Sequence, residues 1–219
     1  MGKVAYFALG TAGAGGLGAG GVTLYNKLGQ AEESKATSIV TLKDKYSQAI
    51  LNASDTGIWD KKYEALKTAS PSNSKLRDAV NRAKLSSPDK NGALELLKSG
   101  CEEVYLVQAD DESGLSDFKS LCSKTNENVT SSTGSFIADQ VSGNSDKWDT
   151  SLTSLKDHTG ELDDVLKKLK ADIQSSQSTF PQDKKTELKN WCDAARVSIF
   201  EGSNSVKFKN QEAFCKSSA

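Results

Sequence analysis

The chain has little of several residue types that catalytic and metal sites need. It holds one histidine, His158, and its only methionine is Met1. Three arginines are present, Arg77, Arg82 and Arg196, so planar guanidinium recognition of phosphate or carboxylate groups has few candidates. A single histidine excludes any site that requires two imidazoles and disfavours zinc. We therefore expect no metal ion and no cofactor.

Strong charge imbalance is also missing, because the formal net charge is −1. A balanced charge predicts no nucleic-acid partner. No G-x-S-x-G turn is present, and residues 110–112 (Asp-Asp-Glu) do not have the alternating spacing of a calcium loop. His158 stands just before Gly160 and is typical of a helix end, while the acids of 161–164 are typical of a first helical turn. These observations predict no catalytic residues and no enzymatic activity.

An apolar segment opens the chain and contains no charge from Val4 to Tyr25. At about 1.5 Å per residue, it is long enough to cross the hydrocarbon core of a membrane as a helix. The first interpretation is therefore an anchor in residues 1–29 that contacts the membrane through residues 4–25. Lys3 precedes the segment, and acids follow soon after Lys27, which weakly favours an N-terminus inside and a body outside the cell.

Two other interpretations of this segment stay open. It could be a secretory signal that is cleaved near Ala12 or Ala14, which would release the body. Gly13, Gly15 and Gly18 also satisfy G-x-G-x-x-G, a pattern of dinucleotide-binding folds. That motif requires further buried parallel strands downstream. No later segment has such a pattern, and repeated glycine and alanine generate this match easily.

The rest of the chain repeats one template. Trp59-Asp60 is followed by Leu66-Lys67, Cys101 and Cys122, and Trp148-Asp149 is followed by Leu155-Lys156, Cys192 and Cys215. The two copies are offset by 89 residues at the tryptophans and by 93 at the last cysteines. This order predicts an internal duplication with a repeat core made by the following side chains: Trp59, Leu66, Trp148, Leu155 and Trp191. The copies differ where Gly100 stands in the place of Trp191.

Apolar residues recur with the period of a helix, so we expect an all-α fold. Examples are the runs 39–50, 94–105 and 188–199. Ser87 followed by Pro88 predicts a helix start, and Ser113-Gly114 predicts a break. The expected organisation is an N-terminal apolar helix (1–29), a helical module (30–125), a linker or weak helix (126–144) and a second helical module (145–219).

Four cysteines allow three pairings. If each copy is self-contained, the bridges are Cys101–Cys122 and Cys192–Cys215, which join a mid-helix residue to the end of a returning helix. The alternative is four buried free thiols in a cytosolic protein. The export-like N-terminus favours disulfides, because disulfides persist in oxidising compartments.

The layout resembles the large paralogous families of short surface or exported proteins in haemotropic mycoplasmas. The resemblance rests on the Gly/Ala-rich segment Val4–Tyr25, a lysine-rich helical body, the pair Trp191-Cys192 and the terminal run Phe214–Lys216. It implies a protein that is exported or displayed at the cell surface, where it would contact a host cell. It carries over no functional residue.

The sequence therefore predicts a membrane-anchored or exported surface protein that acts as an interaction or antigen module, with a host-cell surface component as partner. The alternative is an exported hydrolase or small-ligand-binding protein whose site uses unidentified carboxylates and lysines. The exposed helix faces mix Lys, Glu, Asp and Ser without a leftover apolar stripe. We therefore expect the body outside the membrane to be monomeric.

Overall fold

The computed structural model of the protein describes residues 39–131, 133–141, 146–176 and 179–217. These residues are mostly helical, and their two strands, β1 (Ser135–Phe136) and β2 (Lys216–Ser217), are two residues long each. The expectation of a mainly α-helical protein is confirmed. The apolar helix expected in the first 29 residues lies outside the described residues.

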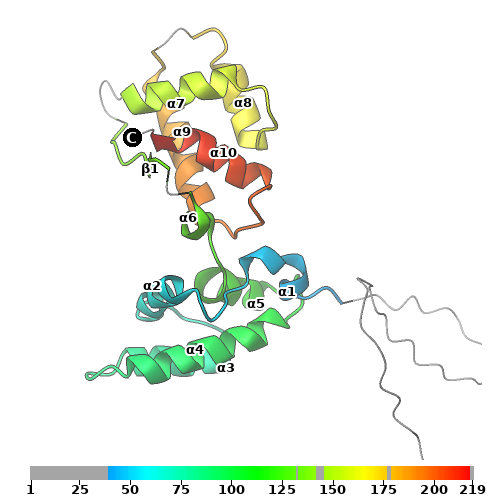
Figure 1. The fold of residues 1–219 in the computed structure, drawn as a ribbon, viewed down its shortest axis with the longest axis vertical. Coiled ribbons are helices and arrows are strands. Elements are labelled where there is room, and N and C mark those ends of the chain that lie inside the picture. Colours follow the sequence, from blue (N-terminus) through cyan, green and yellow to red (C-terminus); the bar gives the residue numbers. More distant parts are fainter. Residues whose placement is uncertain (1–38, 132, 142–145, 177–178, 218–219) are drawn as a thin grey trace, which may run out of the picture. The chain divides into compact units, whose positions relative to one another are not determined.

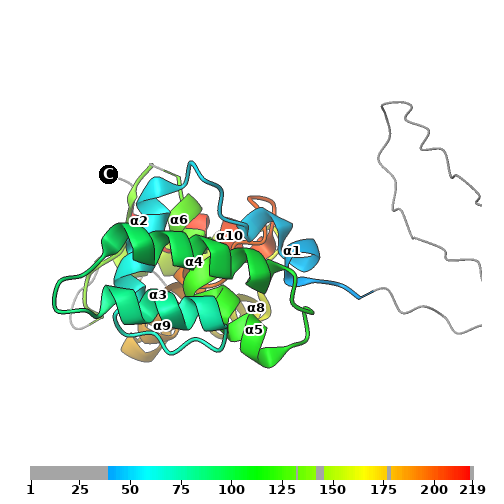
Figure 2. The ribbon, with the colours of Figure 1, turned by 90° about the horizontal axis from the view of Figure 1, so that it is seen from below.

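The helices form two groups with separate cores, the first group in residues 39–125 and the second group in residues 126–217 (Figure 1). The first group contains α1 (Leu42–Lys45), η1 (Ser47–Ala49), α2 (Thr56–Leu66), α3 (Ser74–Ala83), α4 (Lys90–Tyr105), α5 (Glu112–Asp117) and η2 (Phe118–Cys122). The second group contains α6 (Asn126–Val129), α7 (Asp146–Asp157), α8 (Asp164–Asp172), α9 (Gln182–Arg196) and α10 (Val206–Phe214). Within the first group, α3 and α4 run side by side (Figure 2).

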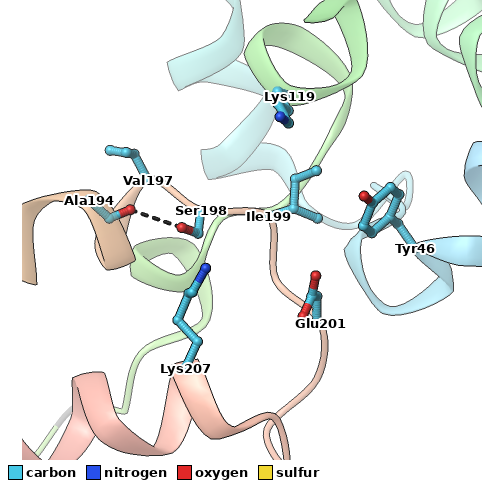
Figure 3. A pocket seen from close by; sticks show the side chains of 8 residues that line it. All are labelled: Tyr46, Lys119, Ala194, Val197, Ser198, Ile199, Glu201 and Lys207. Carbon is cyan, nitrogen blue, oxygen red and sulfur yellow. Dashed lines mark hydrogen bonds between the residues drawn. The ribbon is translucent and has the colours of Figure 1, made fainter. Parts of the chain in front are cut away.

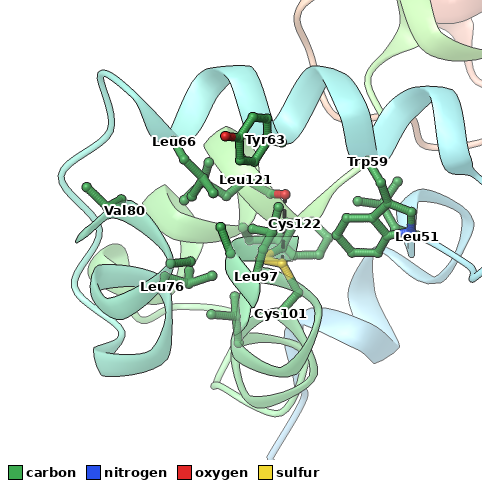
Figure 4. Close-up of a cluster of buried hydrophobic side chains, with 14 of the residues drawn as sticks. Leu51, Trp59, Tyr63, Leu66, Leu76, Val80, Leu97, Cys101, Leu121 and Cys122 are labelled. Carbon is green, nitrogen blue, oxygen red and sulfur yellow. Dashed lines mark hydrogen bonds between the residues drawn. A yellow bond between two sulfur atoms is a disulfide. The ribbon is translucent and has the colours of Figure 1, made fainter. Parts of the chain in front are cut away.

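The first core is built from α2, α3, α4 and η2. Trp59 and Leu66 of α2 are buried against Leu97 of α4, and the Cys101–Cys122 disulfide lies among them (Figure 4). The disulfide joins the middle of α4 to the end of η2, which is a π-helix. The covalent bond therefore holds the last element of the group on the face that α4 presents to the core.

The second core is built from α7, α8, α9 and α10. Trp148 and Leu155 are fully buried along α7, and the Cys192–Cys215 disulfide joins α9 to the C-terminal end of α10. The two disulfides have the pairings that the sequence predicted. Ile137, from the segment expected to be a linker or weak helix, is also buried in this core.

Both groups close in the same way. In the first group, Ser123, which follows the second cysteine, forms an antiparallel bridge with Ile50, which precedes α2. In the second group, Lys216 follows the second cysteine and pairs with Phe136 in β1, which precedes α7. The chain entry and the chain exit of each group are thus hydrogen-bonded to each other, next to the disulfide.

Several helix limits differ from the sequence-based expectation. The run 39–50 does not make one helix, because Tyr46 ends α1 and only the short turn η1 follows before the extended residue Ile50. Ile39 lies outside the helix and is 65% exposed. α4 is capped by the side chain of Asp89, which accepts from Gly92 N at 2.9 Å, and not by Ser87. Gly114 lies inside α5, so the break after α4 falls earlier, at Leu106.

The expectation for run 188–199 was also wrong at its end. α9 stops at Arg196, and Ile199 leaves the helix to pack against the first core. Val165 of α8 is 46% exposed, although it stands three residues after the buried Leu162 and four before the buried Leu169. Helical periodicity predicts which face of a helix is buried, but it does not predict the residue at which the chain leaves the helix and contacts another core.

Candidate functional site

The chain crosses between the two groups through a short antiparallel ladder. Thr125 pairs with Ile199, and the amide of Phe200 donates to Lys124 O at 3.0 Å. The amide of Asn126 donates to Ser198 O, also at 3.0 Å, and its side-chain Nδ2 donates to Ala195 O. Residues 124–126 and 195–200 therefore form one connected structure, which we name the junction.

Charged side chains at the junction are mostly paired. Lys124 bonds Asp55 at 3.0 Å, and both side chains are largely buried. Burial acts to raise the pKa of Asp55, but the amide of Asn52 and the ammonium of Lys124 together hold that pKa below its usual value. Arg196 bonds Glu127 at 3.2 Å. These pairs tie both sides of the junction with charge-assisted hydrogen bonds.

Lys62, on α2, is a buried cation of the first group. Its Nζ donates to Ser120 O in the π-helix at 3.1 Å, and the residue is 7% exposed. Burial lowers the pKa of this ammonium to about 8, while the nearby carboxylate of Glu127 acts in the opposite direction. Its surroundings thus favour the neutral amine more than water does.

A cavity of about 350 Å³ lies beside the junction, and we name it the junction cavity. Its lining comes from four separate parts of the chain: Tyr46; Lys119 of η2; residues 194, 197–199 and 201; and Lys207 of α10. Figure 3 shows Lys119 on one side of the space and Lys207 and Glu201 extending toward it from the other. Apolar contacts come from Val197 and Ile199, so the site is mixed in polarity.

The ring of Tyr46 is held in place at the cavity. It stacks on Phe118 of η2 with ring centroids 5.6 Å apart. Phe118 is fully buried in the first core, so the tyrosine rests on a fixed support. π-Helical turns occur frequently at functional sites, and here the turn that carries Phe118 also carries Lys119.

Two other cavities lie in the second group. One of about 270 Å³ is lined by His158 and Lys209 among others, and the histidine ring packs edge-on against Phe214 with centroids 5.2 Å apart. The other, of about 360 Å³, is lined by Lys147, Lys216 and several hydroxyl groups. These two lysines already pair with acids, Lys147 with Asp139 and Lys216 with Glu212.

Two of the acids considered in the sequence, Asp111 and Asp163, are helix caps. Asp111 accepts from Gly114 N at 3.0 Å at the start of α5, and this bond, together with the Ser113 hydroxyl, lowers its pKa. Asp163 caps α8 and also accepts from Nε1 of Trp191 at 3.1 Å. Within the described ranges, no group of three or more His, Cys, Asp and Glu side chains could hold a metal ion.

The repeat-core tryptophans occupy matching positions. Nε1 of Trp59 donates to Asn52 O at 2.9 Å, and Nε1 of Trp148 donates to Asp139 O at 3.0 Å. Each carbonyl belongs to the segment that enters the group before its tryptophan helix. The tryptophans therefore fasten the entering chain to the core, as buried indoles with a satisfied N–H commonly do.

Sequence reasoning missed the lining of the junction cavity. Tyr46, Lys119, Glu201 and Lys207 share no motif and are separated by up to 161 residues of chain. No local feature of the sequence marks these four residues as members of one site.

No helix within the described part of the chain is long and apolar enough to span a membrane. Residues 4–25, on which the predicted anchor rests, lie outside that part. Comparisons of the chain with protein-family models, with curated proteins and with solved structures found no match.

Proposed function

We propose that the protein is an exported, membrane-tethered surface protein whose body is a non-catalytic interaction or antigen module facing a host cell. The observation that carries the proposal is the pair of disulfides, one in each helical group. Disulfides of this structural kind persist in oxidising compartments, outside the cytosol. The charge-free segment Val4–Tyr25 would supply the tether as an apolar helix.

We further propose that the two groups arose by internal duplication. Support comes from the shared order of Trp, Leu and two cysteines, from the matching indole hydrogen bonds and from the matching pairing after each second cysteine. Duplication followed by divergence of exposed faces suits an antigen family of the kind that the sequence resembles. The exposed faces mix charges of both signs, and so we expect a monomeric body with mostly polar, salt-sensitive partner contacts.

The test has two readouts, a protease treatment of intact cells that display the protein and an alkylation of the protein taken from them. Protease added outside should remove the body while an internal marker survives. Alkylation under denaturing conditions, before any reduction, should label none of the four cysteines. A body that resists the protease until lysis, together with four labelled thiols, would contradict the proposed location.

The ligand-binding alternative is supported by one observation, the junction cavity with its lysines and its carboxylate. A hydrolase would need a nucleophile or an activated water beside a base. The cavity holds the Ser198 hydroxyl, but this group donates to Ala194 O at 2.9 Å. The lining contains no histidine that could activate it. Binding without catalysis is therefore the form of the alternative that the geometry favours.

A further inference from the structure

We propose that the junction cavity binds a small dicarboxylate that also carries an amino group, such as an acidic amino acid or an acidic dipeptide. The proposal does not depend on the proposed location, because binding is a property of the folded body. It rests on two observations. Charged side chains from distant parts of the chain line one cavity, and these side chains have no ion-pair partner among the described residues.

The charges of the junction cavity are not neutralised within the protein. Among the described residues, Lys119, Glu201 and Lys207 make no ion pair with any other residue, although all three line the same space. Neighbouring cations behave differently, since Lys124 and Arg196 each have a carboxylate partner. The cavity therefore presents two ammonium groups and one carboxylate that are available to a ligand.

A small ligand can carry the opposite charges to these three groups. A ligand with two carboxylates and one ammonium would place each carboxylate against a lysine and its ammonium against Glu201. Ion pairs of this kind are charge-assisted hydrogen bonds, which are stronger than neutral ones. The hydroxyl of Tyr46 has no hydrogen-bond partner among the described residues and adds a further donor at the same space. Inorganic anions would leave Glu201 unmatched and are therefore disfavoured.

The cavity is also built from parts that hold their positions. Lys119 lies on η2, which the Cys101–Cys122 disulfide fixes, and Tyr46 rests on the buried ring of Phe118. Glu201 follows the junction ladder directly, after the amide of Phe200. Backbone positions that are fixed before binding reduce the entropy lost when the ligand arrives. Its volume of about 350 Å³ lies at the lower end of the range for small-molecule sites.

The other two cavities fit this ligand less well. In the cavity beside α7 and β2, both lysines are already paired with acids. In the cavity beside His158, the buried amide of Asn210 is satisfied by Asp163 N and Glu161 O. Neither offers two unpaired lysines facing a free carboxylate.

The experiment is calorimetric titration of the full-length protein in mild detergent at low salt. L-glutamate is expected to bind with a dissociation constant below about 1 mM. Glutarate, which lacks the amine, should bind more weakly, and L-lysine and inorganic phosphate more weakly still. Absence of glutamate binding, or tighter binding of L-lysine or phosphate, would overturn the proposal.

Variants locate the binding. Lys119→Met and Lys207→Met should each raise the dissociation constant at least about tenfold, which corresponds to about 1.4 kcal/mol. Lys119→Arg should keep most of the affinity, because it keeps the charge. Lys61→Met is the matched control, since Lys61 is an exposed lysine of α2 outside the cavity and its loss changes the net charge equally. An equal effect of Lys61→Met would show unspecific attraction and refute the site.

Glu201→Gln should change the affinities for two ligands in opposite directions, which a merely structural role of Glu201 would not produce. Loss of the carboxylate should weaken L-glutamate, whose ammonium loses its partner, and should strengthen glutarate, which is relieved of a repulsive charge. A change in the same direction for both ligands would contradict the assigned role of Glu201. Failure of these titrations would leave the protease and alkylation results untouched, so the two proposals are tested separately.

Discussion

The first and second helical groups follow one plan but differ where their second and third helices meet, counted from the tryptophan helix: α3 with α4 in the first group and α8 with α9 in the second. In the first group, a Cβ on Gly100 of α4 would stand 2.7 Å from Cδ2 of Leu76 on α3, so the close contact requires glycine. In the second group, the corresponding place holds Trp191, whose indole reaches Asp163 at the start of α8. Glycine allows the helices to approach, and tryptophan keeps them apart and bridges them by a hydrogen bond.

The difference shows which part of the plan is constrained. In both groups a disulfide fixes the third helix to the last element, with sequence separations of 21 and 23 residues. The second helix has no such link, so its distance from the third helix can follow the side chains between them. Covalent links and indole hydrogen bonds are shared, while interhelix packing diverges.

The aspartate after each tryptophan differs in the same way. Asp60 pairs with Lys90 at 2.8 Å where both side chains are more than half exposed. Asp149 pairs with Lys185 at 2.7 Å, with side-chain exposures of 16% and 4%, and also accepts from Phe180 N at 3.1 Å. The same motif is thus a solvated pair in the first group and a buried anchor in the second.

The largest expected effect concerns the tryptophans. Trp59→Ala and Trp148→Ala should each lower the free energy of unfolding by about 3–5 kcal/mol, because each leaves a cavity and an unpaired carbonyl. Since the cores are separate, amide hydrogen exchange should accelerate mainly in the altered group. Val165→Ala, at an exposed position of α8, is the control and should change stability by less than about 0.5 kcal/mol. Equal acceleration in both groups would show that the two cores unfold as one.

The next largest effect is expected from removal of the disulfides. Replacing both cysteines of either pair by alanine should cost about 3 kcal/mol in the chain-entropy model, and nearly the same for both pairs, because the closed loops are of similar length. Thermal unfolding followed by circular dichroism measures each loss. If one pair proved far more important than the other, the two groups would not share a common way of holding the last element.

Removing the lysine of each aspartate pair should lower the stability of the two groups by different amounts. Lys185→Met leaves the largely buried carboxylate of Asp149 without its cation and should cost about 2–3 kcal/mol. Lys90→Met removes an exposed pair and should cost less than about 1 kcal/mol. Urea unfolding of the two variants gives the comparison directly. Equal losses would contradict the assignment of a buried anchor to the second group alone.

Lys62→Met should change stability by less than Lys185→Met and in the opposite direction, because it should stabilise the protein. The pKa of Lys62 is lowered to about 8 in the folded state, below the usual value of 10.5, so the unfolded chain binds more protons between these values. Stability of the natural protein should therefore rise from pH 7 to pH 9.5 by roughly 2 kcal/mol. Lys62→Met should gain roughly 1–2 kcal/mol at pH 7 after losing the bond to Ser120 O, and it should lack that rise.

The measurement is urea unfolding at several pH values below 10. Above that range Tyr105 interferes, since burial raises its pKa to about 12 and the unfolded phenol ionises first. Lys61→Met, one residue away and exposed, is the control and should keep the natural pH profile. A profile for Lys62→Met that matches the natural protein would show that another group causes the rise.

Much of the helical architecture could be predicted from the sequence. The periodic leucines of α4, α7 and α9, the positions of the tryptophans and the cysteine pairings follow from local spacing and from the repeat of one template. Local spacing fails where a side chain outside the pattern competes. Asp89 takes the cap that Ser87 was expected to make, because its carboxylate reaches the amide of Gly92.

The junction and its cavity were decided only by the tertiary structure. Ile199 continues the apolar spacing of α9, yet it leaves the helix to pair with Thr125 and to contact the first core. Lys119, Glu201 and Lys207 come together because the disulfide, the ladder and the start of α10 each place one of them. Sequence periodicity reports which face of an element is buried, whereas the meeting of charges from distant elements depends on how two cores are joined.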